Sequence, residues 1–534
     1  MAGLESAGAP SGRGGIPALD SLAPDQHRIL AYASAIGSEF DFDMLAAAMR
    51  VDEEVLVEQL ERLVRSKTLW ERPGGGRFGF VEEEFRANVY RSLTESRLRV
   101  LHRRVAEVME RMYPNPTPEV VAELGRHFFL GKVPEKSYDY NRRAARSATD
   151  AGEPVVAIHH FERALVDLAT LGGEREAERA SLAEELGDLY SATANYPAAD
   201  RHYQEALAHV EHDQPRVRAR LLLARAEVAR ENLDSDAAKE GALQAIRLFE
   251  MTGDPLGVAR AHRLLGRLAF LRGAYRDALD ESMHALETLP PGTDPRFLGR
   301  LSIDIGNAFA LLGPEVQSVG IEWYERAVER LRASRDWAEL ARALHNLGVA
   351  VGEIRPEDGL EYLAQARDAA ERAHDARYSA RTLLSGVEMR IMLGQLEDAD
   401  RDNEQAGRLL ERLDDTLGSG QVALHRGRIA ERRGQWDDAD RAYSTAVDMA
   451  RRNRVVSDEA EAQFDLARLR LKTRDFEGAR TALRAATELN VVELVPRLAS
   501  AYLELRHQLE GPGSATDTDR DEVGAGNATE GRKA

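Results

Sequence analysis

Few residues in this sequence combine the types and spacing that catalysis or metal binding requires. His159 and His160 are adjacent, but a metal site needs more ligands converging at suitable spacing, so we interpret them as part of an ordinary helix. Gly131-Lys132 lacks the upstream glycine and the following hydroxyl of a phosphate-binding loop, and the sequence holds no G-x-x-x-x-G-K-[ST] motif. The Asp-Ser-Asp run at 234–236 suits an inter-helix turn. The sequence therefore predicts no catalytic residue, no metal site and no cofactor, and indicates that the protein is not an enzyme.

Arginine and asparagine recur at intervals that would place them on one face of a repeated structure. Arg220, Arg260, Arg300 and Arg342 are separated by 40, 40 and 42 residues. Arginine grips carboxylates through two parallel hydrogen bonds, and asparagine pairs with a peptide backbone, so the pattern predicts a groove for an extended, acidic peptide. The alternative is chance alignment, or pairing with glutamates of adjacent repeats. The predicted groove residues are Arg220, Arg260, Arg263, Arg267, Arg300, Asn307, Arg342, His345, Asn346 and Arg428.

A second binding candidate is the basic segment from residue 86 to residue 146. It holds 13 arginines and lysines against 7 acidic residues, a net charge of +6 in a chain whose net charge is −19. The segment could dock an acidic partner or nucleic acid, or its arginines could pair with acidic repeats of the same chain. The residues predicted to form this basic docking surface are Arg97, Arg99, Arg103, Arg104 and Arg111.

The elements that would position these side chains repeat at a fixed period. A small residue marks each of nine copies, with steps of 39 to 42 residues between them. A period of this size predicts a stacked array of helical units. The marker residues are Ala164, Ala206, Ala245, Ala285, Ala327, Ala366, Ala406, Ala446 and Ala486.

The second copy carries the clearest motif, Leu186-Gly187-x-x-Tyr190 followed by Ala199-x-x-x-Tyr203 and Ala206. In this pattern the glycine lets two helices approach closely, and we expect the aromatic residues to fill the gap against the neighbouring repeat. Residues 137–509 resemble tetratricopeptide-repeat proteins. The resemblance implies a right-handed superhelix of about nine 40-residue hairpins over 137–490. The first helix of each hairpin would line its concave side, and a capping helix would follow at 491–510.

The N-terminal region differs from the repeats. A helix is predicted from Pro24 to Gly37, a second over 43–49 and a third after Asp52. A β-hairpin signal follows, with strands at 68–72 and 78–81 around a Pro-Gly-Gly-Gly turn. Three helices and a hairpin are the order of a winged helix, predicted over 18–93. Residues 94–136 would be linking helices, beginning with an amphipathic helix at 94–112.

Residues 16–165 also resemble the part of STAND-type ATPases, and of their LuxR-type and maltose-regulator-like relatives, that follows the ATPase domain. The matching stretches include Ile16-Pro17-Ala18-Leu19, Phe78-Gly79-Phe80 and Val89-Tyr90-x-x-Leu93. Such relatives usually carry histidine two residues after the hairpin phenylalanine, where this chain has Glu82. Because the sequence has no phosphate-binding loop, the resemblance does not imply that this chain hydrolyses ATP.

Composition narrows the setting. The sequence has no cysteine and no apolar run of about 18 residues, which favours a cytoplasmic protein without a membrane segment. A net charge of −19 argues against bulk affinity for nucleic acid. The predicted third helix, which would read DNA in a winged helix, carries four glutamates against two arginines. Residues 1–17 and 511–534 have the composition of disordered ends.

Together these observations predict an all-α, non-catalytic scaffold or sensor. It would bind a protein partner or acidic peptide in the concave groove of the repeats, in regulation or signal transduction. One alternative is a DNA-binding transcription regulator that uses the winged helix. The other is a partner subunit of a separately encoded P-loop ATPase, which would dock on the basic segment.

Overall fold

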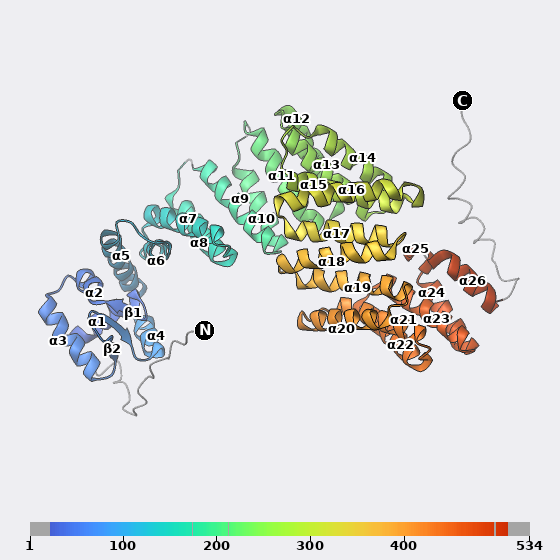
Figure 1. Ribbon diagram of the computed structural model, residues 1–534. Helices are drawn as coiled ribbons and strands as arrows, with labels where there is room; N and C mark the ends of the chain where they lie inside the picture. Colours follow the sequence, from blue (N-terminus) through green and yellow to red (C-terminus); the bar gives the residue numbers. More distant parts are fainter. Residues whose placement is uncertain (1–21, 174, 212, 496–497, 511–534) are drawn as a thin grey trace. The chain divides into compact units, whose positions relative to one another are not determined.

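The computed structural model describes residues 22–173, 175–211, 213–495 and 498–510, and nearly all of this part is helical (Figure 1). The predicted disordered ends, 1–17 and 511–534, lie outside the described residues. The chain divides into two units, Met1–Gly257 and Val258–Ala534, which are taken separately below.

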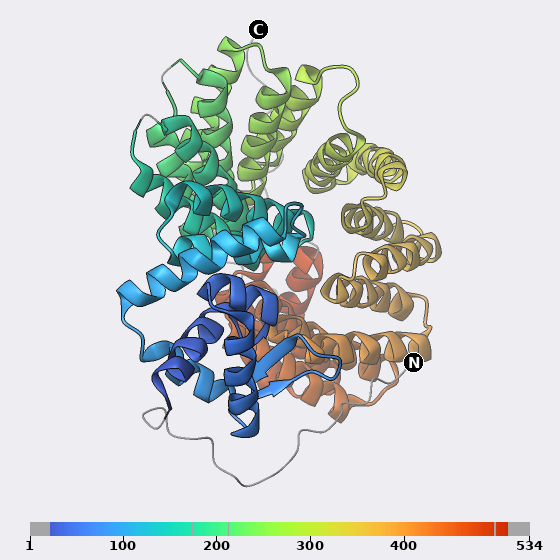
Figure 2. The same ribbon diagram turned by 90° about the vertical axis from the view of Figure 1, so that its left-hand side faces the viewer.

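The first part of unit 1 combines short helices with a three-stranded antiparallel sheet of strand order β1-β3-β2 (Figure 2). In β2 and β3, which overlap the predicted hairpin stretches, Leu69 is opposite Phe80. Strand β1, in which Phe40 is opposite Phe78 on the other edge of β3, was not predicted from the sequence. A three-residue strand is too short to show the alternation that identifies strands in a sequence. The elements are α1 (Pro24–Ile36), β1 (Glu39–Asp41), α2 (Phe42–Met49), α3 (Glu53–Arg65), β2 (Leu69–Glu71) and β3 (Arg77–Phe80).

Three helices connect this sheet-containing part to the repeats: α4 (Glu83–Arg91), α5 (Glu95–Met112) and α6 (Pro118–Leu130). The helix predicted at 94–112 matches α5, whose first turn is capped by the hydroxyl of Thr94. Its apolar face is buried, with Leu101 and Val105 at 2% and 0% exposure. The opposite face of α5 is left to polar and basic side chains.

Beyond α6 the described chain forms nine helical hairpins, which confirms the predicted all-α, tetratricopeptide-like repeat architecture. We call the first helix of each hairpin its A helix and the second its B helix. Unit 1 holds the hairpins α7 (Pro134–Asp150) with α8 (Pro154–Leu171), α9 (Glu176–Ala192) with α10 (Tyr196–His209), and α11 (Pro215–Glu231) with α12 (Ser235–Met251).

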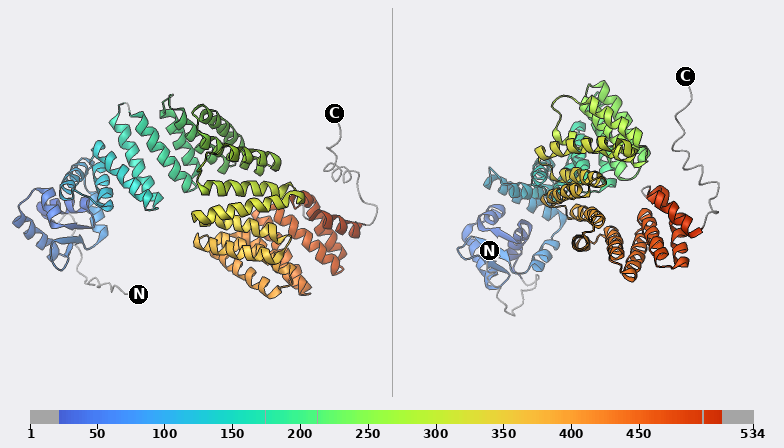
Figure 3. Two further views of the ribbon diagram at one scale, coloured as in Figure 1. Left: turned by 45° about the horizontal axis from the view of Figure 1, so that its top comes forward. Right: turned by 45° about the vertical axis from the view of Figure 1, so that its right-hand side comes forward.

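The other six hairpins belong to unit 2, apart from the first residues of α13, and their helices pack side by side (Figure 3). They are α13 (Pro255–Leu271) with α14 (Tyr275–Thr288), α15 (Pro295–Leu312) with α16 (Gln317–Ser334), α17 (Trp337–Gly352) with α18 (Pro356–Arg372), α19 (Ala376–Met392) with α20 (Leu396–Arg412), α21 (Thr416–Arg432) with α22 (Trp436–Asn453), and α23 (Val456–Lys472) with α24 (Phe476–Glu488). A 3-10 turn at Pro314–Val316 lies between α15 and α16.

The nine marker alanines all lie on B helices and are all buried, with exposures of 0% to 2%. A methyl group is the largest side chain that lets a B helix approach its neighbours this closely, because a longer chain would have to displace packed atoms. The periodic alanine is therefore a packing requirement that recurs once in each hairpin.

Some glycines of the A helices lie against a tyrosine ring of their own hairpin, as Gly187 and Gly427 do. A Cβ added at Gly187 would lie 2.6 Å from the ring of Tyr203, and one added at Gly427 would lie 2.5 Å from the ring of Tyr443. The expectation that such aromatic residues fill the gap between repeats is thus corrected for this position, since the ring covers the glycine on the partner helix. Tyr190 does reach the preceding hairpin, where its hydroxyl donates to Glu162 at 2.6 Å.

In unit 2 the A helices of consecutive hairpins contact one another directly, from α15 through α17, α19 and α21 to α23. On the other side, the B helices α16 and α18 are separated by an open groove with a volume of about 960 Å³. When the A helices pack closely together and the B helices lie further apart, the array curves toward its A helices. The A-helix face is therefore the concave side here, as the repeat resemblance implies.

Two helices follow the last hairpin, α25 (Val491–Leu494) and α26 (Ala499–Glu510), in place of the single capping helix predicted over 491–510. Val495, which ends α25, precedes a proline in the sequence and has a non-helical backbone. A residue before proline is disfavoured in the helical region, which accounts for the break. Tyr502, Leu505 and Leu509 of α26 are buried against the last hairpin.

Candidate functional site

The A-helix face carries the predicted groove residues, and most of its arginines pair with carboxylates of adjacent A helices. In unit 1, Arg220 of α11 donates through two nitrogens to Glu184 of α9, at 2.6 and 2.7 Å. Such a bidentate pair is geometrically specific and ties one A helix to the previous one.

The same pairing recurs in unit 2. Arg263 of α13 lies 2.6 Å from a carboxylate oxygen of Asp304 on α15. Arg300 and Arg342 approach the carboxylate of Glu339 on α17 at 3.2 and 3.0 Å. Pairing between neighbouring repeats, the alternative to an open peptide groove, therefore holds for Arg263 and Arg300, whereas Arg342 pairs with a glutamate of its own helix.

Arg428 is the most enclosed of the predicted groove residues. Its guanidinium lies 2.8 Å from Glu388 on α19, 2.8 Å from Asp465 on α23, and also pairs with Glu461 on α23. Burial would lower the pKa of Arg428, but these three carboxylates hold it well above its ordinary value. The side chain is only 16% exposed, so it joins three A helices rather than presenting a charge to a ligand.

Two predicted asparagines meet on adjoining A helices. The side-chain nitrogen of Asn346 on α17 donates to the side-chain oxygen of Asn307 on α15 at 2.8 Å. The same oxygen accepts from the hydroxyl of Tyr324 on α16, also at 2.8 Å. Both asparagines are half-buried. The contacts fix their orientation and leave the Asn307 amide nitrogen and the Asn346 amide oxygen without another contact in the described part of the chain.

The other predicted groove residues differ in exposure. Arg260 is exposed on α13 and makes no ion pair within the described residues, while Arg267 is half-buried on the same helix. His345 is buried at 4% exposure, with its ring 5.5 Å from that of Tyr378 on α19. Burial lowers the pKa of His345 to about 4, so it packs as a neutral ring between α17 and α19 and is not offered to a ligand.

The basic residues predicted for docking lie along α5. Arg97, Arg99, Arg103 and Arg111 are exposed and make no ion pair in the described part of the chain. Arg104 is half-buried and donates to the hydroxyl of Tyr32 on α1 at 2.6 Å, so it has a structural role. We call the four exposed arginines the basic α5 surface.

A half-buried tyrosine ring of α4 and two buried histidine rings connect α4, α5 and α6. The hydroxyl of Tyr90 is 2.7 Å from His102, whose second ring nitrogen is 2.9 Å from a ring nitrogen of His127. Burial lowers the pKa of His102 to about 4 and that of His127 well below its ordinary value, with Arg126 adding to both shifts. A hydrogen bond between two imidazoles needs one donor and one acceptor nitrogen, which two neutral rings supply and two protonated rings cannot.

The acidic partners of the arginines were missed in the sequence, although a signal for them exists. Asp304 follows Arg263 by 41 residues, Asp465 follows Arg428 by 37, and Glu184 precedes Arg220 by 36. An acid one repeat away from a groove arginine is therefore the sequence sign of a pair between adjacent A helices. Within the described ranges, no group of three His, Asp or Glu side chains could hold a metal ion, and no helix is long and apolar enough to cross a membrane.

No family model matches the chain, and no curated protein matches its sequence. Among solved structures it is similar to a STAND protein with a tetratricopeptide-repeat sensor from Pyrococcus horikoshii (TM-score 0.45, 13% identity), covering 87% of this chain and 66% of that one. It is also similar to aspartyl phosphate phosphatase F from Bacillus subtilis (TM-score 0.45, 12% identity), covering 66% and 94%. A third is the apo form of RapI (TM-score 0.41, 15% identity), covering 52% and 98%. At these identities and TM-scores the similarities do not assign the chain to a family.

Proposed function

We propose that the protein is a non-catalytic scaffold or sensor that binds an extended, acidic segment of a partner protein along the A-helix face. Its place would be in regulation or signal transduction in the cytoplasm. The observation that carries the proposal is the pair Asn307 and Asn346. Their mutual hydrogen bond leaves one amide donor and one amide acceptor on adjoining helices, which is what the backbone of an extended peptide requires.

The surroundings of Asn307 and Asn346 favour binding of a partner with little loss of side-chain conformational entropy. The ion pairs between A helices hold the side chains of this face in place before a partner arrives, and preorganised groups lose less entropy on binding. Arg342, one helical turn before Asn346, is 41% exposed, and Arg260 is exposed on α13. Both supply positive charge for an acidic segment.

The test is capture of the partner from a lysate of the host cell, identified by mass spectrometry, followed by titration of the purified partner. Asn346→Ala and Arg260→Glu should each weaken binding about tenfold or more, in line with the loss of a central contact in an interface. Arg408→Glu is the matched control, because Arg408 is exposed on the B helix α20 and pairs only with the neighbouring Glu404. Equal affinity for all four proteins would exclude the A-helix face as the binding site.

The second candidate function is that of a partner subunit for a separately encoded ATPase. The N-terminal part resembles the winged-helix region that follows the ATPase in STAND-type regulators, and the basic α5 surface offers four unpaired charges for docking. Arg99→Glu with Arg103→Glu should abolish co-purification of a P-loop protein while leaving binding at the A-helix face intact. Co-purification that survives both charge reversals would exclude this surface.

The DNA-binding alternative has less support. The exposed side of α3, the helix that would enter a groove of DNA, carries Glu53, Glu54, Glu58 and Glu61, and Arg65 pairs with Glu61 at 3.4 Å. A helix of this charge is repelled by phosphates. Fluorescence anisotropy with duplex DNA at low salt distinguishes the cases, since binding that is lost on Arg97→Glu with Arg103→Glu would favour DNA.

A further inference from the structure

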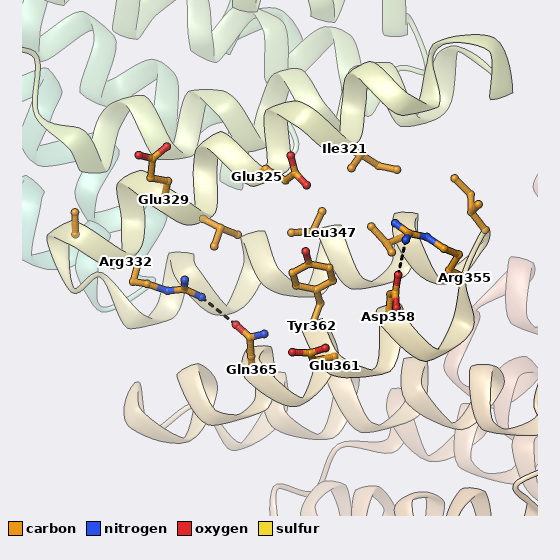
Figure 4. Close-up of a pocket in the computed structure, with 14 residues that line it drawn as sticks. Ile321, Glu325, Glu329, Arg332, Leu347, Arg355, Asp358, Glu361, Tyr362 and Gln365 are labelled. Carbon is orange, nitrogen blue, oxygen red and sulfur yellow. Dashed lines mark hydrogen bonds and ion pairs between the residues drawn. The ribbon is translucent and has the colours of Figure 1, made fainter.

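The groove between the B helices α16 and α18 lies on the side of unit 2 opposite the A-helix face, with α17 as its floor (Figure 4). We call it the B-helix groove. Its volume of about 960 Å³ comes from the separation of the two B helices described above. The B-helix groove is separate from the sequence motifs and from the face that carries the proposed function.

The floor and one end of the B-helix groove are apolar. Leu347 and Val351 of α17 belong to the buried core beneath it, and Ile321 and Tyr362 are half-buried against that core. Ile354, at the end of α17, is 60% exposed. The hydroxyl of Tyr362 makes no hydrogen bond in the described part of the chain and projects into the groove (Figure 4). Exposed aliphatic and tyrosine side chains beside a concave surface are typical of protein docking sites.

The walls of the B-helix groove are acidic. Glu325 and Glu329 lie one turn apart on α16, and Glu361 faces them from α18 (Figure 4). None of the three carboxylates forms an ion pair among the described residues. Two arginines also line the groove. Arg355 pairs with Asp358 at 2.8 Å, and Arg332 donates to the neutral amide of Gln365 at 2.9 Å, so its charge offsets one of the three carboxylates. The unsatisfied charge of the groove is therefore negative.

We propose that the B-helix groove docks a cationic amphipathic helix of a partner protein. The apolar stripe of such a helix would cover Ile321, Tyr362 and Ile354, and its lysines or arginines would lie between the carboxylates of the two walls. The groove-lining residues of α16 run from Ile321 to Ala333, about 18 Å at 1.5 Å per residue, which corresponds to about three turns of a bound helix. An acidic peptide or a nucleic acid would be repelled, so this occupant differs from the one proposed for the A-helix face.

The probe is a fluorescein-labelled 14-residue peptide of leucine and lysine, spaced to form one apolar and one basic helix face, titrated into the full chain by anisotropy. Glu325→Lys with Glu329→Lys should weaken its binding about tenfold or more, because each reversal puts a like charge against the peptide. Glu322→Lys with Glu357→Lys is the control, since both residues are exposed on the same two helices, do not line the groove and change the net charge equally. Less than a twofold effect is expected there.

A second readout separates groove binding from general attraction to an acidic protein. On binding, amide hydrogen exchange should slow in α16 to α18 and stay unchanged in α20 to α22. Equal weakening by the two double variants, equal binding of a leucine–glutamate peptide, or no binding would each overturn the proposal. Arg260→Glu tests the A-helix face alone and should leave binding of the cationic peptide unchanged, so failure of one proposal does not imply failure of the other.

Discussion

The contact between Gly427 and Tyr443 gives a prediction that can be worked out from distances. Replacing Gly427 with alanine places a methyl carbon 2.5 Å from two ring carbons of Tyr443. The optimal separation of two carbons is about 3.5–4.0 Å, so ring and methyl must move apart by about 1 Å or more. Gly420 on the same helix, α21, provides the control, because its added Cβ would find no heavy atom closer than 3.8 Å.

The ring of Tyr443 has little freedom to move. It is 0% exposed, and its hydroxyl donates at 2.9 Å to Glu431, which Arg468 also contacts at 2.9 Å. Overpacking of this kind costs about 1–3 kcal/mol, and loss of the tyrosine hydrogen bond adds about 1 kcal/mol. Alanine recovers about 1 kcal/mol of helix propensity at either position. We therefore expect Gly427→Ala to destabilise unit 2 by about 1–3 kcal/mol and Gly420→Ala to stabilise it by about 0.5–1 kcal/mol.

Urea unfolding followed by circular dichroism, with hydrogen exchange of α21 and α22 as the local readout, measures the difference. Exchange is needed because repeat arrays do not always unfold in one step. A further test is Gly427→Ala combined with Tyr443→Leu, in which the methyl group meets no ring and costs less than it does alone. The reasoning is refuted if Gly427→Ala is as stable as Gly420→Ala, or if removing the ring does not relieve the cost.

Three further predictions follow from buried polar groups. Arg428→Met leaves three carboxylates without their shared cation and should destabilise unit 2 by about 3–5 kcal/mol in urea unfolding, whereas a loss below 1 kcal/mol would mean that the pairs contribute little. Asp336→Ala removes the N-cap of α17 and should cost about 1 kcal/mol, seen as faster exchange in its first turn; unchanged exchange would contradict this. The pKa of His102 is about 4 in the folded protein, whereas its ordinary value is 6.5. As the pH drops from 6.5 to 4, the unfolded chain therefore takes up a proton at this residue before the folded protein does, and the stability should fall. Thermal unfolding at pH 7.5 and pH 5 checks the sign, and His102→Phe should reduce the difference; an equal or higher midpoint at pH 5 would contradict it.

The repeat architecture could be predicted because one small set of residues is subject to the same packing constraint in every hairpin. Ala206 and Ala446 are buried for the same reason, and Gly187 and Gly427 each lie under a tyrosine ring. The periodic recurrence of these residues is therefore what made the repeat architecture predictable from the sequence. Strand β1 has no such periodicity, since its pairing depends on Phe40 packing against Phe78 and Phe80, residues distant in the sequence.

The site was harder to predict, because a sequence does not show whether a charge is already neutralised. Arg260 and Arg428 occupy the same kind of position on an A helix, yet the first is exposed and the second is surrounded by three carboxylates. The burial of His345 depends on the neighbouring helix α19 in the same way. The B-helix groove left no sequence signal, because it arises from the distance between two helices and not from any motif.

The contacts between A helices also determine in which direction unit 2 bends most easily. Two contacts connect α15 to α17 along one edge: the ion pair of Arg300 with Glu339 and the hydrogen bond of Asn346 with Asn307. Along the other edge, α16 and α18 are separated by the B-helix groove. Separating the A helices breaks an ion pair and an amide hydrogen bond, whereas widening the gap between α16 and α18 breaks the hydrogen bond from Arg332 to the neutral amide of Gln365. Unit 2 would therefore bend about its A helices, and a change in its curvature would change the width of the B-helix groove. A helix bound in that groove would set the curvature of unit 2 and, with it, the spacing of the side chains that we propose bind a peptide on the opposite face.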